Sequence, residues 1–430
     1  MKKPIRVGFV GSRFAAKFHW EAIRRVYGVP VEIVGVTSKT PEARDAFARE
    51  AGIKAFETFD ELCAAVDVVD LCTPPSSHEE LAVQALGLEK HVIIEKPLTG
   101  YYGANVSGFE GRSFSKEQML REATASCARI LAAAKASGKR VCYAENWVYA
   151  PSIQKEREII QKSGGQVLWM LGEQSHGGSH SPYYGRWKFS GGGSLVGKGC
   201  HPVSAALYLK RVEGEARNGV PIRPATVSAR THEITRLPNY RDEGFLRTSY
   251  DDIEDYAQIH ITFSDGTVAD IFSSELVMGG VDNWLEVFCN NHRTRCNLNP
   301  TNAVETFNPR EDIFQDVYVV EKISTKQGWS CPSPDEGWQH GYPQEFQDFM
   351  ESIYQDREPL SGIELARDTI ATLYTGYLSV ERGGAEVSVR PFCRGEKFVN
   401  CDVKGGVGRA FEKRRPIGKV EFALRRQGFS

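Results

Sequence analysis

The first hundred residues alternate between short apolar runs and segments with the spacing of helices. The apolar runs lie at residues 5–10, 31–36, 66–72 and 92–94. The segments between them, such as residues 41–52, have the spacing of helices. Strands that alternate with helices at this spacing predict a parallel, doubly wound sheet. In such a sheet, ligands bind at the carboxyl ends of the strands.

A glycine turn follows the first apolar run and precedes a helical segment. Gly11 and Ala16 fit the G-x-G-x-x-G/A pattern of dinucleotide-binding turns, but Arg13 replaces the middle glycine. At such a turn, the helix N-terminus and its free N–H groups bind the pyrophosphate. The turn therefore predicts a dinucleotide site. Its expected contacts are Gly8, Gly11, Ser12, Arg13, Phe14 and Ala15.

The residues after the second apolar run bear on the choice between NAD and NADP. NAD sites usually place an acidic residue there for the ribose diol. This chain has Thr37, Ser38 and Lys39 instead, and a small polar residue followed by a cation tolerates a 2′-phosphate. The alternative is that Lys39 is only solvated, or lies over the adenine, and that NAD is used. Both cofactors stay open, with a preference for NADP and with Ser38 and Lys39 as expected contacts.

The strand predicted within residues 91–99 ends in a charged pair and a proline, Glu95-Lys96-Pro97. The proline restricts the backbone and thereby holds the Lys96 ammonium in one place. The alternative interpretation is a strand end with a surface ion pair and a turn. The position at the carboxyl end of a buried strand favours a binding site. The further expected cofactor contacts are Thr73, Pro74, His78, Glu95 and Lys96.

Five short motifs follow one another in an order known from one family of oxidoreductases. They are residues 8–11 with His19 eight positions on, residues 72–78, residues 95–97, residues 191–193 leading to His201, and residues 342–349. On these motifs the chain resembles the glucose–fructose oxidoreductase/inositol dehydrogenase family, Gfo/Idh/MocA. The motifs before residue 210 carry most of this resemblance, and residues 342–349 are similar to a C-terminal helix of the family.

The resemblance implies an α/β protein. An N-terminal Rossmann domain with a doubly wound parallel sheet would span residues 1–147. A C-terminal α+β domain with a large open, mostly antiparallel sheet would span residues 148–430, bind the substrate and mediate oligomerisation. Family members mostly transfer hydride between a nicotinamide and a hydroxyl of a sugar or cyclitol. The resemblance further implies that Lys96 reaches the nicotinamide ribose and the substrate, that His201 serves in proton transfer, and that the protein forms homodimers or homotetramers.

The second half of the sequence shows strand patterns rather than strand–helix alternation. Ser264-Asp-Gly266 is a hairpin turn between two of these strands, which indicates a meander-like sheet. Helices are expected at residues 118–137, 342–356 and 364–382. The expected strands of the second sheet are residues 166–172, 225–236, 256–263, 267–274 and 284–289.

A polar and aromatic loop, residues 175–187, precedes the Gly191–Gly193 motif. Sugar sites use this mixture, because flat aromatic rings cover C–H faces and short polar groups bind hydroxyls. The alternative is a structured loop whose histidines only bind the backbone. The expected substrate contacts, which include two residues after the last strand of the first domain, are Asn146, Tyr149, His176, His180, Tyr183, Tyr184, Arg186, Trp187 and Lys198.

Residues 194–201 are predicted to form one helix that ends in His201. The family often has an acid four residues before this histidine, but here the position is Gly197, followed by Lys198. At helical spacing Lys198 and His201 share a face, and the lysine would lower the pKa of the histidine. The expected catalytic residues are Lys96, His201 and Lys198. His201, or Lys96 if its pKa is depressed, would accept the hydroxyl proton while the lysines face the developing alkoxide.

Two cations near a reacting carbon are costly to bury unless an anion pairs with them. Lys198 and Arg186 therefore suggest an acidic sugar, namely a uronate, a sulfonated or a phosphorylated sugar. The alternative is that Lys198 binds hydroxyls of a neutral sugar. Two other functions stay open. One is a glycoside hydrolase that uses NAD without net consumption, for which Gly197 and the aromatic loop leave room. The other is a nucleotide-bound sensor without turnover.

Composition narrows the classes of partner. Lys and Arg number 53 against 55 Asp and Glu, so the formal net charge is −2 and no bulk attraction to nucleic acid or membranes is expected. No apolar run has the length of a transmembrane helix, and the start has no signal-peptide core, so a cytoplasmic protein is expected. Ten dilute cysteines without zinc spacing predict reduced thiols and no metal. Residues 101–115 are interpreted as an inserted loop near the active-site mouth, and the basic run in residues 409–426 as a solvated face.

Overall fold

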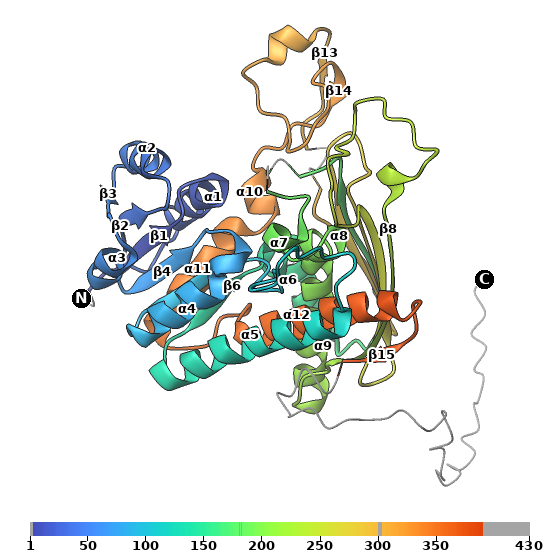
Figure 1. Ribbon diagram of the computed structural model, residues 1–430, viewed down its shortest axis with the longest axis horizontal. Helices are drawn as coiled ribbons and strands as arrows, with labels where there is room; N and C mark the ends of the chain where they lie inside the picture. Colours follow the sequence, from blue (N-terminus) through green and yellow to red (C-terminus); the bar gives the residue numbers. More distant parts are fainter. Residues whose placement is uncertain (1–2, 180, 182, 300–302, 390–430) are drawn as a thin grey trace, which may run out of the picture. The chain divides into compact units, whose positions relative to one another are not determined.

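The computed structural model of the chain describes residues 3–179, 181, 183–299 and 303–389. Two large sheets organise this part, and helices pack on and between them (Figure 1). The basic run expected near the end of the chain lies outside the described residues. Among the described residues, every helix lacks the length or the apolar character that a membrane crossing requires.

The first sheet is parallel throughout and has the strand order β3-β2-β1-β4-β5-β6. It confirms the predicted doubly wound sheet. The direction in which successive strands are added reverses between β1 and β4. The middle residues of β4 and β5 are fully buried, as expected for parallel strands covered by helices. The strands are β1 (Ile5–Val10), β2 (Val31–Thr37), β3 (Lys54–Ala55), β4 (Val68–Leu71), β5 (His91–Glu95) and β6 (Val141–Ala144). The helices are α1 (Phe14–Ile23), α2 (Pro41–Ala51), α3 (Phe59–Ala65), α4 (His78–Gly87) and α5 (Lys116–Ser137).

The second sheet is mostly antiparallel and has the order β12-β11-β7-β10-β9-β8-β15. The expected meander holds for β8, β9 and β10, but β7 lies between β10 and β11 and runs parallel to β10. Local strand patterns could not reveal this insertion, because it joins segments about a hundred residues apart. The strands are β7 (Val167–His176), β8 (Pro224–His232), β9 (Tyr256–Phe263), β10 (Val268–Ser274), β11 (Val281–Cys289), β12 (Arg293–Asn297) and β15 (Val387–Ser388).

Three long helices pack on the second sheet: α6 (Pro151–Ser163), α9 (Cys200–Asn218) and α12 (Ile363–Glu381). The last of these lies beside α5 and also contacts β8 and α9, so it joins the two sheets (Figure 1). Fifteen of its 19 residues are buried, which is expected of a helix that is covered on several sides. The division into domains at residue 147 falls within a short helix, η2 (Asn146–Tyr149), and stays a prediction.

The remaining elements are short, apart from α11. The chain between β12 and α11 leaves the second sheet, and its two strands pair only with each other (Figure 1). We call residues 303–339 the arm. The remaining elements are η1 (Pro75–Ser77), α7 (Trp187–Ser190), α8 (Ser194–Gly197), η3 (Ile234–Arg236), β13 (Thr306–Asn308), η4 (Glu311–Phe314), β14 (Gly328–Ser330), α10 (Glu336–Gln339) and α11 (Tyr342–Gln355).

The inserted loop of residues 101–115 forms no helix or strand but is packed against the second half of the chain. A side chain at Gly111 would come within 2.2 Å of Trp187, so only glycine permits this approach. The Gly111 amide also donates to the carboxylate of Asp252 at 2.6 Å. Trp187 is only 2% exposed, and its indole N–H donates to the carbonyl of Tyr101. The prediction that Trp187 contacts the substrate is therefore wrong, because this side chain holds the loop.

The short helix η2 anchors α11 to the first domain. Tyr149 is 2% exposed, and its hydroxyl donates to the carboxylate of Asp348 at 2.8 Å and accepts from the Ser361 amide at 2.9 Å. Asn146 is buried and donates its side-chain amide to the carbonyl of His340. Both side chains were expected to contact substrate. The expectation for Tyr149 is wrong, since its only polar atom is buried and fully used by the fold.

We expect Tyr149→Phe to lower the free energy of unfolding by about 1–3 kcal/mol, because it leaves the buried Ser361 N–H without an acceptor. Denaturant unfolding measures this loss. The same variant is expected to keep the wild-type KM for substrate. Tyr183→Phe is the matched control, since Tyr183 is 49% exposed, and it should leave stability unchanged. A Tyr149→Phe protein with normal stability and a raised KM would restore the substrate role.

Candidate functional site

The turn after β1 fits the pyrophosphate of a dinucleotide. Gly11 has a φ of +106°, and a Cβ on it would lie 2.6 Å from the Cys72 carbonyl oxygen, so glycine is required there. The N-terminus of α1 has no side-chain cap, which leaves the first N–H groups of the helix free for a ligand. The hydroxyl of Ser12 is buried and forms no hydrogen bond with a described residue. An acceptor-rich phosphate would satisfy all these donors.

The other residues expected at the cofactor fall into two groups. Arg13 and Phe14 are exposed at the start of α1, and Lys39 is exposed beyond β2, where the chain has no acid. These contacts stay predictions. Gly8 lies inside β1, and a Cβ there would meet Leu62 of α3 at 2.6 Å. The missing side chain of Gly8 thus makes room for α3, and its contact with the cofactor stays a prediction.

His78 is also a structural residue rather than a cofactor contact. Its side chain is fully buried, with Nε2 2.9 Å from the Thr73 carbonyl oxygen and Nδ1 3.2 Å from that of Pro97. It therefore ties the turn after β4 to the turn after β5. Thr73 and Pro74 lie on the solvent side of this link, and both remain accessible to a ligand.

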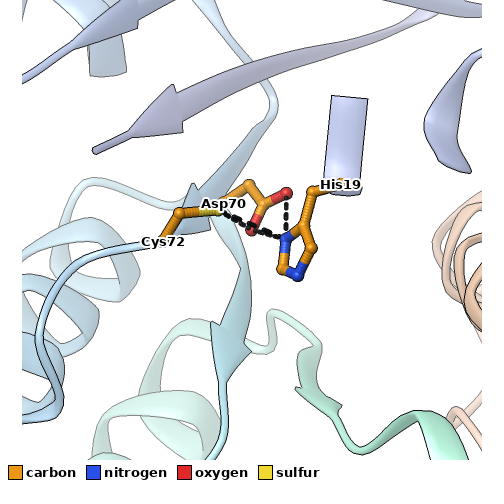
Figure 2. A group of neighbouring side chains, drawn as sticks. All are labelled: His19, Asp70 and Cys72. Atoms are coloured by element: carbon orange, nitrogen blue, oxygen red, sulfur yellow. Dashed lines mark hydrogen bonds and ion pairs between the residues drawn. The ribbon is translucent and has the colours of Figure 1, made fainter. Parts of the chain in front are cut away.

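A buried histidine links α1 to the ends of β4 and β5. His19 of α1 is fully buried, with Nδ1 2.9 Å from Asp70 and 3.3 Å from the Cys72 sulfur, as Figure 2 shows. Its Nε2 lies 3.1 Å from the carboxylate of Glu95. Burial lowers the pKa of His19, but Asp70 and Cys72 together outweigh burial and raise the pKa well above its ordinary value. The charged imidazolium is thus favoured, with a carboxylate within hydrogen-bond distance of each ring nitrogen.

The donor atoms of His19, Asp70 and Cys72 lie close enough together to bind one metal ion. Their protonation favours a hydrogen-bonded network instead. Burial raises the pKa of the Cys72 thiol to about 12, and metal ligation requires a thiolate and a neutral imidazole. The cluster therefore serves to fix the Glu95 carboxylate beside Lys96.

Lys96 follows Glu95 at the carboxyl end of the sheet. The Lys96–Pro97 peptide bond is cis, and the ammonium donates to the Gly197 carbonyl at 3.3 Å. Although burial opposes the shift, Cys200 and the carboxylates of Glu95, Glu145 and Glu321 raise the pKa of Lys96. This direction does not favour the alternative in which Lys96 acts as a base with a depressed pKa. Its ammonium suits the stabilisation of negative charge.

His201 is held by an acid that the sequence analysis missed. Its Nδ1 lies 2.5 Å from the carboxylate of Glu145, and its ring stacks on the indole of Trp147 with an interplanar angle of 23°. Burial lowers the pKa of His201, the Lys96 charge lowers it further, and Glu145 opposes both effects. The neutral ring donates from Nδ1, which leaves Nε2 as an acceptor without a partner among the described residues. Glu145 directly follows the buried strand β6, and Glu95 is the last residue of β5, so both acids stand at the carboxyl ends of strands, and that position was the available signal.

Lys198 and His201 do not share the face of one helix. The predicted helix is broken, because α8 ends at Gly197 and α9 begins at Cys200. Lys198 is 3% exposed and forms an ion pair with the buried carboxylate of Glu275, which also accepts from the Tyr184 hydroxyl. Burial lowers the pKa of Lys198, and Glu275 opposes this shift.

The positive charges of Lys198 and Arg186 do not indicate an acidic sugar, because both are paired within the protein. Lys198 is paired with Glu275, and Arg186 forms an ion pair with Asp251 at the surface. Neither cation therefore requires an anion from the substrate. Of the remaining expected contacts, Tyr183 is exposed and the ring of His176 accepts from the Gly178 amide. His180 lies outside the described residues.

A second buried acid borders the site from α11. Glu345 is fully buried, and neither of its carboxyl oxygens has a hydrogen bond with a described residue. Burial raises the pKa of Glu345 well above its ordinary value; His19 opposes this shift, and the carboxylates of Glu95 and Glu145 add to it. The neutral form of this carboxyl group is therefore favoured. It lies within the family-like motif of residues 342–349, to which no functional residue was assigned from the sequence.

Family models match both halves of the chain. Residues 5–105 match a model described as an oxidoreductase family with an NAD-binding Rossmann fold. Residues 153–294 match the GFO/IDH/MocA C-terminal domain.

Curated relatives match over shorter stretches. Over 93 residues the chain is 34% identical to glucose-6-phosphate 3-dehydrogenase of Bacillus subtilis, which covers 22% of this chain and 26% of that protein. Over 126 residues it is 31% identical to dTDP-3,4-didehydro-2,6-dideoxy-alpha-D-glucose 3-reductase of Saccharopolyspora spinosa, which covers 28% of this chain and 37% of that protein. The chain thus matches only about a quarter to somewhat over a third of these relatives' lengths.

Solved structures share the fold over nearly all of their length. GenD2 from gentamicin A biosynthesis, in complex with NAD, has a TM-score of 0.72 at 23% identity and covers 90% of this chain and 97% of its own. The WlbA dehydrogenase from Bordetella pertussis, in complex with NADH and UDP-GlcNAcA, has a TM-score of 0.64 at 18% identity, with 90% and 98% covered. With both halves matched by models of one family and the fold shared, the chain belongs to the Gfo/Idh/MocA family, and its first domain is an NAD-binding Rossmann domain.

Proposed function

We propose that the chain is an NAD(P)-dependent oxidoreductase that transfers hydride between the nicotinamide and a hydroxyl-bearing carbon of a sugar or cyclitol. The observation that carries this proposal is the neutral His201, held by Glu145 with Nε2 free, beside the charged Lys96. A base and a cation at the carboxyl end of a Rossmann sheet are what alcohol oxidation requires. The printed names of the curated relatives, which are dehydrogenases and a reductase of sugars, support it.

The residues have separate roles in this proposal. When bound, the cofactor supplies the hydride acceptor through its nicotinamide ring. The α1 turn with Ser12 would hold the pyrophosphate of the dinucleotide. His201 accepts the hydroxyl proton at Nε2, and Glu145 stabilises the imidazolium that results. The Lys96 ammonium offsets the negative charge that develops on the substrate oxygen. Lys198, previously expected to act on the substrate, orients Glu275 and Tyr184 instead.

A screen of sugars and cyclitols with NAD and with NADP tests the function. We expect one class of sugar to produce reduced cofactor, and NADP to be favoured because no acid follows β2. Lys39→Ala should weaken NADP binding and leave NAD binding unchanged. Release of a chromogenic aglycone without net cofactor reduction would show the redox-neutral hydrolase instead. Cofactor binding without either reaction over the whole panel would favour the sensor.

The pH dependence of sugar oxidation tests the role of His201. Because the pKa of His201 lies below its ordinary value of 6.5, the neutral base is present above that pKa. We therefore expect kcat/KM to rise with pH through an inflection below 6.5 and then to stay flat. His201→Asn should lower kcat by about 10²- to 10⁴-fold. Glu145→Gln should move the inflection to lower pH, since Glu145 raises the pKa of His201.

The matched control for these variants is His292→Asn. His292 is also paired with an acid, Glu156, but it lies in the turn between β11 and β12. Its loss should change neither the rate nor the pH profile. An unaltered profile in His201→Asn would contradict the assignment of the base.

We also propose a homodimer or homotetramer through the second sheet. Alternate residues of β9 are buried, and those between them, such as His260, are only partly exposed. Trp169 and Phe288 stack on neighbouring strands with their ring centroids 4.5 Å apart, and both are partly exposed. Burying this face would remove apolar surface from water. Light scattering at micromolar concentration is expected to show two or four copies, and a monomer would contradict the proposal.

A further inference from the structure

A short acidic segment, residues 251–255, precedes β9. Its members Asp252, Glu254 and Asp255 are buried, with exposures of 9%, 5% and 0%. Each of these three carboxylates accepts hydrogen bonds from backbone N–H groups of another segment. Asp252 binds the inserted loop and α7, Asp255 binds η3, and Glu254 binds the Gly191–Gly193 motif. The segment therefore joins four separate parts of the chain, and Glu254 is its link to the glycine motif.

Glu254 binds three successive N–H groups at the start of α8. Its Oε2 accepts from the Gly193 amide at 3.2 Å, and its Oε1 accepts from the Leu195 amide at 2.9 Å. Its backbone carbonyl accepts from the Ser194 amide at 3.1 Å. The first N–H groups of a helix have no acceptor within the helix. Glu254 thus supplies the acceptors that α8 lacks.

Two glycines of the motif allow this close approach. A Cβ on Gly193 would lie 2.2 Å from the Glu254 carbonyl oxygen and 2.5 Å from its carboxyl carbon. Gly192 has a φ of +153°, and a Cβ there would lie 2.3 Å from the hydroxyl oxygen of Tyr377 in α12. That hydroxyl donates to Glu254 Oε1 at 2.8 Å and accepts from the Gly193 amide at 3.1 Å. The motif is therefore glycine-rich because Glu254 and Tyr377 contact its backbone.

The turn that Glu254 holds also carries the acceptor for Lys96. The Gly197 amide, at the end of α8, donates to the Gly193 carbonyl at 2.8 Å. The Gly197 carbonyl accepts from the Lys96 ammonium at 3.3 Å, and among the described residues it is the one hydrogen-bond acceptor of that ammonium. A single helical turn thus connects the Glu254 carboxylate to the group that fixes Lys96.

We propose that Glu254 is a positioning residue for the reaction, because it holds α8 and thereby the Gly197 carbonyl that orients the Lys96 ammonium. This inference rests on the proposed function, in which Lys96 faces the negative charge that develops on the substrate oxygen. Without the Glu254 carboxylate, the start of α8 loses two acceptors and the Gly197 carbonyl shifts. A displacement of about 1 Å at the reacting groups can lower a rate about 10²-fold, even when the altered residue lies outside the reacting centre.

The charge of Glu254 is not what holds α8. Burial raises the pKa of Glu254 to about 7, and the hydrogen bonds from Leu195, Tyr377 and Gly193 oppose this shift. Both protonation states keep an oxygen that accepts from the Leu195 amide. Glu254→Gln, which also keeps one such oxygen, is therefore the conservative variant, and Glu254→Ala is the variant that removes both acceptors.

Crystal structures of the full-length wild type, Glu254→Ala and Asp255→Ala test the positioning role without any assay of activity. Asp255 is the matched control, since its carboxylate also accepts from two backbone N–H groups, those at the start of η3. We expect the Lys96 ammonium and the Gly197 carbonyl to separate beyond about 3.5 Å in Glu254→Ala, where no hydrogen bond remains. Wild type and Asp255→Ala should keep this bond. Its retention in Glu254→Ala would overturn the proposal.

Steady-state kinetics at pH 8 test the consequence for turnover. We expect Glu254→Ala to lower kcat about 10- to 100-fold and to keep KM for sugar and cofactor within about threefold, because Lys96 acts on charge that develops in the transition state. Glu254→Gln should retain most of kcat. Asp255→Ala should keep the wild-type kcat, although both alanine variants should unfold at lower denaturant concentration than wild type.

Tyr377→Phe is a second variant in case Glu254→Ala does not fold. It removes the hydroxyl that binds both Glu254 and Gly193, so a smaller loss of kcat in the same direction is expected. An equal loss of kcat in Glu254→Ala and Asp255→Ala would show a role in folding alone and would refute the positioning role, as would a wild-type kcat in both Glu254→Ala and Tyr377→Phe. If the wild type reduces no cofactor with any sugar, the proposed function fails, and the crystal structures still decide the role of Glu254.

Discussion

The buried imidazolium of His19 is the interaction on which the rest of the site depends. It joins α1, which carries the cofactor turn, to the ends of β4 and β5 through Asp70 and Glu95. A buried charge is stable only when its partners are fixed, so this contact sets the position of three elements at once. Because Lys96 directly follows Glu95, the geometry of the dinucleotide turn and of the reacting cation is determined by one side chain.

The pKa values of Lys96 and His201 shift in opposite directions, which gives the two residues different roles. Glu95 and Glu145 hold the pKa of Lys96 above its ordinary value, whereas burial and the charge of Lys96 lower that of His201. Neighbouring groups whose pKa values move in opposite directions are the usual arrangement of an acid and a base at one centre. The same carboxylate of Glu145 acts on both, so it couples the charge of Lys96 to the basicity of His201.

Local periodicity predicted the parallel sheet, the α11 and α12 helices and most strands of the second sheet, since these patterns depend on neighbouring residues. It could not predict the break between α8 and α9, because Lys198 there pairs with Glu275, which lies 77 positions away. It could not separate core aromatics from exposed ones either. Trp187 and Tyr149 are buried by segments 86 and 199 residues distant, whereas Tyr183 in the same loop as Trp187 stays exposed.

The arm and the cofactor side of the site are held in place in different ways. The cofactor side is built from strand ends and a helix N-terminus, which the sheet itself positions. The arm has only the β13–β14 pair, and an isolated two-stranded hairpin is marginally stable in water. Further order comes from contacts within the arm, such as the hydrogen bond from the Ser333 amide to the carbonyl of buried Val319. Residues 319–321 are thus held by Ser333 and Glu336 of the arm itself, so the order of this segment depends on the arm's own contacts, whereas the order of the cofactor turn depends on the Rossmann sheet.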